Sequence, residues 1–435
     1  MSLGSSLARS LRTVAAAAGV GAETLLPVDA NPVPADWRHV TKVDPETAKP
    51  LPVAYPLYLR HTDAVSVGGS SAVTAENTEE TFRLLARAPV PAFHEPSEAR
   101  HVTERTRELA AFLALPEVLN GETEALVGTL GEGLAYLRDE MVPGLLRERL
   151  PGPLYRAVGD PLADLATSWL LEAAVFEAYI VQNPSSAAAR RSGVDESDVL
   201  SPATARERAM VADRHLDSEV VYVEYSGTYG GDEAADVLRA VSESVNGARV
   251  WYGGGIDDRE KTRAMLDAGA DTVVVGDCFH DVADEEVEVC ARAVEALGVA
   301  PSAADIRSWF DAEVDPAGTA AARYLRTAPG VDDPEAAAER ALLAALALCF
   351  GALPAVVPAG PGRSDGSTGD PADRTRALLS GMDADATGRL EAALADDGDD
   401  ALDACCARVA AALSDADPEP QRVRHLSLSK LSVSR

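Results

Sequence analysis

The clearest pattern in the chain is a series of short apolar runs, each followed by a stretch with helical spacing. Three runs rich in β-branched residues cover positions 220–225, 249–252 and 272–276, and each ends in small residues or glycine. Apolar residues after each run recur at the three-to-four-residue interval of an amphipathic helix. Strands that alternate with helices in this way predict a parallel sheet wrapped by helices.

Five earlier runs extend the same pattern toward the N-terminus. We expect these strands at 39–43, 64–67, 90–94, 112–119 and 178–182. Eight strand–helix units between residues 37 and 298 predict a (β/α)8 TIM barrel, an α/β fold of near-typical size. An open dinucleotide-binding fold fits less well, because no Gly-x-Gly-x-x-Gly motif opens a helix after the first strand.

The regions around and within the barrel differ in character. Residues 121–178, after strand four, have helical spacing broken at Pro143 and Pro151, which predicts a helical insertion. That insertion could wall an apolar channel or form a separately packed unit, and the pattern favours neither. The expected division is a partly disordered N-terminal lead (1–35), the barrel (36–298), an α-helical C-terminal extension (299–351), a linker (352–374), and an acidic helical segment with a basic tail (375–435).

Charge restricts the partners of the chain. It carries a net charge of -31 over 435 residues, so nucleic acid is not expected to bind. The four lysines are Lys42, Lys49, Lys261 and Lys430. An acidic surface poor in lysine indicates a halophilic, archaeal cytoplasm, although codon bias in a GC-rich genome gives a similar composition. The basic tail allows peripheral contact with an anionic membrane, but a solvated tail is the simpler interpretation.

The cysteines and apolar runs bear on location. The five cysteines show no Cys-x-x-Cys spacing, which favours reduced thiols in the cytoplasm. The alanine-rich start of the chain is a weak match to a secretory signal. We expect no membrane-spanning run.

Glycines at successive strand ends are the first indication of chemistry. The runs Gly253–Gly255 and Gly276–Asp277, with Ser226–Gly227, leave backbone N–H groups uncovered at one rim of the expected barrel. Such groups bind phosphate in barrels of this type. One glycine run after a strand would indicate only a turn, but three within a short window favour an anion site.

These strand ends also carry a family resemblance. The motifs are YVEYSG at 222–227, YGGGI at 252–256, VVGD at 274–277, TKVDP at 41–45, EPS at 95–97 and NPSS at 183–186. They resemble the geranylgeranylglyceryl phosphate synthases and the related bacterial heptaprenylglyceryl phosphate synthases. The resemblance implies a prenyltransferase that forms the first ether bond of archaeal membrane lipids, from sn-glycerol 1-phosphate and a prenyl diphosphate, geranylgeranyl diphosphate by preference.

The resemblance also implies where the substrates bind. Asp44, just past strand one, and Ser70, in place of the usual threonine, would hold Mg²⁺, a cation that prefers oxygen ligands. Glu224 is the carboxylate of strand six that alternation turns inward, and it can act as the general base. The residues expected to bind glycerol phosphate are Lys42, Tyr222, Val223, Glu224, Tyr225, Ser226, Gly227, Gly255, Gly276 and Asp277.

Two other interpretations stay open at this point. The stretch after strand four departs from the family, which usually has Trp, Thr-Gly and Lys-His residues there. The chain could therefore be a phosphate-binding barrel that is non-catalytic or acts on another phosphorylated substrate. We also expect a homo-oligomer.

Overall fold

A computed structural model describes residues 29, 31–69, 71–123, 129–356, 370–394, 401–414 and 424–431. Eight parallel strands form one sheet in the order β3-β2-β1-β8-β7-β6-β5-β4. The strands are β1 His39–Val43, β2 Ala64–Val67, β3 Ala92–His94, β4 Ala114–Val118, β5 Val175–Val181, β6 Val220–Glu224, β7 Arg249–Gly253 and β8 Thr272–Val275.

The sheet closes on itself through its two end strands. His94 and Leu113 form a parallel bridge between β3 and the start of β4, and the His94 N–H donates to Phe112 O at 3.1 Å. The predicted (β/α)8 barrel is thus confirmed. The largest difference in strand bounds is at β5, which begins at Val175 rather than at residue 178. Val175 already pairs with Ala114 of β4, and the pairing with β6 begins at Glu177.

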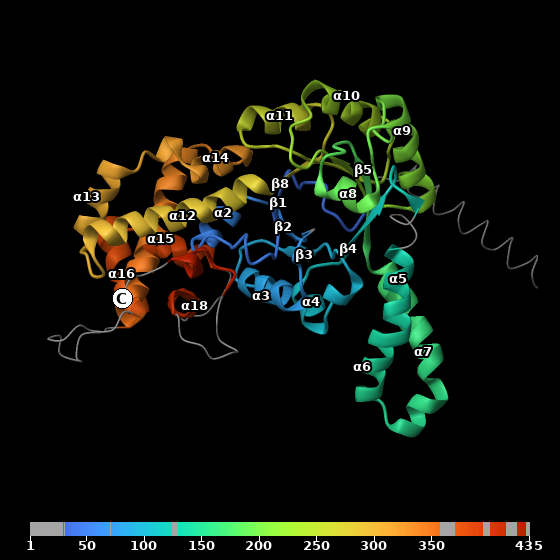
Figure 1. Cartoon of the computed structure of the whole chain (residues 1–435), viewed down its shortest axis with the longest axis horizontal. Coiled ribbons are helices and arrows are strands. Elements are labelled where there is room, and N and C mark those ends of the chain that lie inside the picture. Colours follow the sequence, from blue (N-terminus) through green and yellow to red (C-terminus); the bar gives the residue numbers. More distant parts are fainter. Residues whose placement is uncertain are drawn as a thin grey trace, which may run out of the picture.

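Helices follow the strands and cover the outside of the barrel (Figure 1). They are α2 Tyr55–Leu59, α3 Ala75–Leu85, α4 Glu104–Leu109, α8 Ala187–Ser192, α9 Pro202–Val211, α10 Gly231–Ser242, α11 Arg259–Asp267 and α12 Asp277–Leu297. Hydroxyl and carboxylate side chains begin several of them: Thr74 caps α3 with Asn77 in a reciprocal capping box, and Asp258 accepts from the Lys261 N–H at the start of α11.

The insertion after β4 is a helical arm that projects away from the barrel (Figure 1). The arm comprises α5 Thr129–Tyr136, a π-helical turn at Leu137–Met141, α6 Val142–Arg149 and α7 Gly152–Glu172. Few of its side chains are buried, and the exposed fractions of Leu165 and Trp169 are 65% and 63%. The expected helical insertion is therefore present, and much of its surface is left uncovered.

The C-terminal extension forms a helical layer against one side of the barrel (Figure 1). Its helices are α13 Ala303–Glu313, α14 Ala320–Thr327, α15 Pro334–Val356, α16 Pro371–Met382, α17 Ala386–Ala393 and α18 Ala401–Leu413. Helix α15 packs against α14, α16 and α18, and α12 connects this layer to the barrel. Helix α15 also runs past residue 352, where a linker was expected; residues 357–369 lie outside the described part.

Helix α15 corrects one sequence-based expectation. It is long and apolar enough to cross a membrane by length and composition, whereas no such run was expected. However, 83% of its most apolar window is buried inside the protein. Its apolar residues are therefore accounted for by packing in the extension.

The barrel interior has an aromatic floor. Trp37 precedes β1 and stacks with Phe93 and Phe112, at ring-centroid distances of 6.2 Å in both cases. Trp251 lies against the same group, 5.8 Å from Phe93. Because these large side chains fill the amino-terminal end of the barrel, space for a ligand is left at the carboxyl ends of the strands.

Candidate active site

A pocket of about 930 Å³ opens at the carboxyl ends of the strands. Its polar wall is formed by residues that end β1, β3, β5, β6, β7 and β8, and its apolar wall includes residues of the helical arm. Asp44, Glu224 and Gly276 all line this one pocket. The sequence placed these three residues at separate strand ends, and the barrel brings them together.

Glu224 ends β6 with a side chain that is only 2% exposed. The Ser226 N–H donates to Glu224 Oε1 at 3.1 Å, whereas Oε2 has no hydrogen-bond partner among the described residues. Burial raises the pKa of the Glu224 carboxyl, and the hydrogen bond from Ser226 opposes this effect. A buried carboxylate oxygen without a partner is costly, which is a property expected of a group that meets a ligand proton.

Tyr222 lies one inward position before Glu224 and is held by aromatic packing. Its ring stacks on that of Tyr179, with centroids 4.4 Å apart and an interplanar angle of 15°. Gly253 leaves room for the Tyr222 hydroxyl, because a Cβ there would come 2.7 Å from Tyr222 Cζ. The phenol is thus positioned beside the backbone of β7 at the edge of the pocket.

Lys42 is a partly buried cation at the pocket, held by a carboxylate from the end of β3. Its Nζ donates to both oxygens of Glu95, at 2.8 and 3.0 Å. Ser66 Oγ and the Tyr179 hydroxyl donate to the same carboxylate, each at 2.9 Å. Burial alone would lower the pKa of Lys42, but Glu95 outweighs it and raises that pKa. Lys42 therefore stays cationic.

This network contains residues that the sequence analysis did not identify. The role of Glu95 was left open, and Ser66, Tyr179 and Glu177 were not considered. Glu177 is 1% exposed and neither of its carboxylate oxygens has a partner among the described residues. Burial, followed by the charge of Glu95, raises its pKa well above the usual range. Alternation along β5 was the available signal, since it turns Glu177 and Tyr179 to the same side.

Glycines that follow β7 and β8 form one side of the pocket, where the sequence predicts a phosphate site. Gly255 has a φ of +54°, and a Cβ there would lie 2.6 Å from the Tyr229 nitrogen, so only glycine fits without strain. Gly276 is the N-cap of the 21-residue helix α12, and the first residues of this helix, Asp277 and Cys278, line the pocket with it. Asp277 is exposed. A Cβ at Gly276 would make only ordinary contacts, at 3.6 Å or more.

The other residues expected to bind glycerol phosphate on and after β6 point to two different sides of the strand. Ser226 and Gly227 line the pocket, as alternation predicts for Ser226. Val223 and Tyr225 instead pack between the strands and the outer helices, where the Tyr225 hydroxyl donates to Glu233 at 3.3 Å. The side chains of Val223 and Tyr225 thus point away from the pocket, and neither residue lines it, contrary to the sequence-based expectation that they bind glycerol phosphate.

Asp44 lines the opposite edge of the pocket, in the loop after β1. Its carboxylate is paired with Lys49, and its N–H donates to His280 Nε2 at 3.2 Å. Burial lowers the pKa of Lys49, but the hydrogen bond and charge of Asp44 outweigh it and raise that pKa. Glu46 is buried nearby and accepts from the Ser71 N–H at 3.2 Å. Ser70, the second expected metal ligand, lies outside the described residues.

These donors are compatible with a magnesium ion. Asp44 already holds a cation at the pocket edge, and its oxygens are the hard ligands that Mg²⁺ prefers. Within the described part of the chain, no cluster of three or more His, Cys, Asp or Glu side chains could hold a metal. Mg²⁺ can take one or two carboxylates and complete its shell with water and substrate phosphate, so Asp44 would be the protein ligand here.

The apolar wall comes from the base of the helical arm and the segments near it. Arm residues that line the pocket are Leu130, Gly133, Leu134, Leu137, Met141, Trp169, Leu170 and Leu171. Of the two interpretations left open by the sequence, the structure supports the apolar wall, because a separately packed insert would not reach the pocket.

The fold and the pocket define a (β/α)8 barrel with glycines at the strand ends, a buried carboxylate and an apolar wall at one rim. A family model described as the PcrB family matches residues 34–294. The chain therefore belongs to the PcrB family, as the motifs indicated. The helical extension lies outside the matched residues.

Named relatives agree with this membership. The chain is 34% identical over 265 residues to the geranylgeranylglyceryl phosphate synthase of Methanoculleus marisnigri, covering 60% of this chain and 97% of the relative. It is 34% identical over 254 residues to that of Halobacterium salinarum, covering 58% and 92%. It is 29% identical over 265 residues to the heptaprenylglyceryl phosphate synthase of Bacillus cereus, covering 60% and 96%.

Solved structures give a weaker likeness. The (S)-3-O-geranylgeranylglyceryl phosphate synthase of Thermoplasma acidophilum, in complex with sn-glycerol-1-phosphate, matches with a TM-score of 0.41 and 21% identity, covering 56% of this chain and 86% of that chain.

Proposed function

We propose that this protein is a prenyltransferase that joins sn-glycerol 1-phosphate to a geranylgeranyl-type prenyl diphosphate through an ether bond. Family membership and the names of the relatives support the reaction class. The single observation that carries the assignment is the position of Glu224. Glu224 has a buried carboxylate oxygen without a partner among the described residues, and it lines a pocket with glycines at strand ends on one side and an apolar wall on another.

The residues suggest how glycerol phosphate is oriented. Its phosphate would take N–H donors from Gly255 and from the first turn of α12, where the helix dipole favours an anion. Ser226 and Tyr222 line the same side of the pocket and can donate to the phosphate or a hydroxyl. Lys42 supplies positive charge from the interior side. This arrangement would leave the 3-hydroxyl near Glu224.

In the chemical step, Glu224 takes the proton of the 3-hydroxyl. The hydroxyl oxygen forms a bond to the first carbon of the prenyl chain, while the bond from that carbon to the diphosphate oxygen breaks. The bonding pair leaves with the diphosphate. Holding the two reactants in one pocket supplies much of the rate, and a positioned base contributes roughly 10²–10⁴-fold.

The leaving diphosphate would lie at the Asp44 edge. Asp44 is the residue there that would hold Mg²⁺, with Glu46 close by. When bound, Mg²⁺ supplies charge neutralisation to the diphosphate oxygens. Lys49 can give up Asp44 and donate to the same oxygens, which would keep a positive charge at this edge. Ser70 remains a proposed ligand.

Location and assembly are part of the proposal as well. All five cysteines are buried and unpaired, which is compatible with a reducing cytoplasm. A homo-oligomer and a halophilic source remain predictions from the sequence.

A prenyl-transfer assay at high salt tests the reaction. Radiolabelled sn-glycerol 1-phosphate is incubated with prenyl diphosphates of different lengths, with and without MgCl₂, and the product is extracted into organic solvent. We expect label in the organic phase that depends on both the prenyl donor and Mg²⁺. If glycerol phosphate binds but no donor gives a product, the chain is instead a phosphate-binding paralogue with another role.

A further inference from the structure

The last described segment, residues 424–431, lies across the loop that follows β1. We call this segment the strap. The Leu51 N–H donates to His425 O at 2.9 Å, and the Ser427 N–H donates to Leu51 O at 2.8 Å. Leu426 and Leu428 are 2% and 0% exposed. The solvated tail favoured by the sequence is therefore wrong for the strap, which adds a parallel bridge to the loop 44–54.

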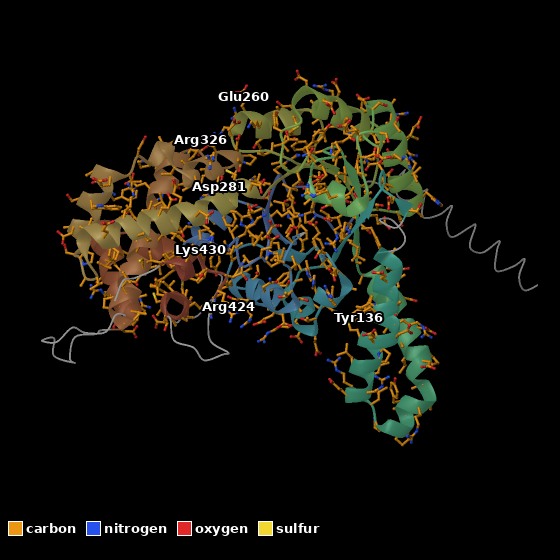
Figure 2. All side chains as sticks on the ribbon, viewed as in Figure 1. Tyr136, Glu260, Asp281, Arg326, Arg424 and Lys430 are labelled. Atoms are coloured by element: carbon orange, nitrogen blue, oxygen red, sulfur yellow. The ribbon has the colours of Figure 1, made fainter. Side chains whose placement is uncertain are left out.

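Side chains of the strap reach the loop and helix α12. Lys430 Nζ donates to Ala48 O at 2.9 Å and pairs with Asp284 of α12, also at 2.9 Å. Figure 2 marks Lys430 where the extension meets the barrel. Ala48 is the residue next to Lys49, so this contact is made directly beside the pocket edge.

A buried carboxylate fastens the other end of the loop. Ser427 Oγ donates to Glu286 Oε2 at 3.2 Å, and the Val53 N–H donates to the same oxygen at 2.6 Å. Glu286 is completely buried. The strap, the loop and α12 thus share one anchor that solvent does not reach.

The opposite side of the loop carries the Asp44–Lys49 pair, which lines the pocket. Asp44 is tied to α12 through His280, but the stretch from Pro45 to Ala54 has no helix or extended strand of its own. Its order depends on contacts made by other parts of the chain. The strap supplies such contacts at Ala48 and at Leu51.

We propose that the strap is a positioning element for the metal and diphosphate edge of the active site. By fixing the loop before a ligand arrives, it removes the entropy cost of ordering Asp44 and Lys49 during binding. The inference rests on the proposed role of Asp44. It gives the C-terminal extension a part in the reaction, although no residue of the strap lines the pocket.

Manganese binding to the chain alone provides a readout independent of turnover. Mn²⁺ takes the same oxygen ligands and is followed by electron paramagnetic resonance at fixed high KCl. The full chain is compared with a chain that ends at residue 423. We expect about tenfold weaker Mn²⁺ binding without the strap, as for loss of groups that orient metal ligands. The KM for glycerol phosphate should change less than about twofold, since the strap makes no contact with the Gly255 side of the pocket.

A point variant covers the case in which the shortened chain does not fold. Lys430→Met removes the tie to Ala48 and leaves Leu426 and Leu428 in place. It should weaken Mn²⁺ binding by about two- to fivefold, the range of a partly exposed ion pair. The matched control is Arg307→Met, which breaks ion pairs with Asp311 and Glu339 inside the extension and should bind Mn²⁺ like the full chain.

Two outcomes would contradict the proposal, and they can be told apart. If the full chain binds no Mn²⁺, the metal assignment at Asp44 fails and the inference fails with it. The second outcome is that the full chain binds Mn²⁺ and the shortened chain, when folded, binds it equally well. If the shortened chain is unfolded, the same comparison is made with Lys430→Met. In either case only the role of the strap is wrong.

Discussion

Glu224 lines the pocket, with a backbone hydrogen bond at one carboxylate oxygen and no partner among the described residues at the other. We expect Glu224→Gln to lower kcat by at least about 100-fold, because the amide cannot accept the hydroxyl proton. The amide keeps the size of the side chain and can still accept from the Ser226 N–H. Glycerol phosphate binding, measured by calorimetry, should therefore stay within about threefold of the unaltered chain.

A control on the same βα unit separates chemistry from stability. Glu233 lies outside the barrel and accepts from the Tyr225 hydroxyl. Glu233→Gln makes the same chemical change without reaching the pocket, and its kcat should be close to that of the unaltered chain. Full turnover by Glu224→Gln would show that another group accepts the proton.

Gly255 illustrates a backbone requirement at the proposed phosphate site. Gly255→Ala forces a side chain onto a residue with φ +54° and places its Cβ 2.6 Å from the Tyr229 nitrogen. We expect a loss of about 1–3 kcal/mol in the free energy of unfolding, measured in urea, together with weaker phosphate binding. Gly144→Ala in α6 meets nothing within 4 Å and should instead stabilise the chain slightly. Equal stability of the two variants would contradict the tight approach of these loops.

At the scale of elements, α12 connects the barrel, the loop after β1 and the strap through Glu286. Burial raises the pKa of the Glu286 carboxyl to about 8, despite hydrogen bonds from Val53 and Ala54. Between pH 4.5 and 8 the folded chain binds this proton and the unfolded chain does not, so raising the pH destabilises the fold. The stability that this proton contributes is fully present below pH 4.5 and is lost by about pH 8. Between these values the free energy of unfolding falls by about 1.4 kcal/mol per pH unit.

Glu286→Gln tests this dependence because glutamine does not titrate. The free energy of unfolding of the unaltered chain, relative to this variant, should fall as the pH rises from 5 to 8 at constant KCl. Glu285→Gln is the adjacent control; it removes a carboxylate that accepts from the Ala320 N–H and should keep the pH dependence of the unaltered chain. Parallel curves for Glu286→Gln and the unaltered chain would contradict the raised pKa.

The same elements show what sequence patterns could and could not predict. Strand periodicity and strand-end motifs were enough to predict the barrel and to place Lys42, Asp44, Glu224 and Gly255 at one rim, because each lies on or just past a single strand. The contacts of Glu95 with Ser66 and Tyr179 join β3, β2 and β5, and depend on how the closed sheet is staggered. The strap was missed because its partners are hundreds of residues away in sequence.

For the whole molecule, the barrel supplies the polar residues of the pocket, and the helical arm and the C-terminal extension add to its rim. The extension packs on the side of α12 and reaches the Asp44 edge through the strap. The arm projects from the other side and contributes the apolar wall (Figure 1). The two additions therefore act at different edges, which suggests that donor-chain binding and diphosphate binding can be altered separately.

The arm gives the sharpest test of that separation. Leu137 lines the pocket, whereas Leu154 lies farther along the arm, is 47% exposed and does not line it. A carboxylate at position 137 would face the prenyl chain in place of the leucine side chain. Loss of this apolar contact should raise the KM for the prenyl donor by about tenfold or more. Leu137→Asp should therefore raise that KM and leave the KM for glycerol phosphate unchanged, in initial-rate assays with each substrate varied in turn. Leu154→Asp makes the same substitution on the same arm and should change neither value. If both variants raise the donor KM alike, the whole arm surface, rather than the pocket wall at its base, handles the prenyl chain.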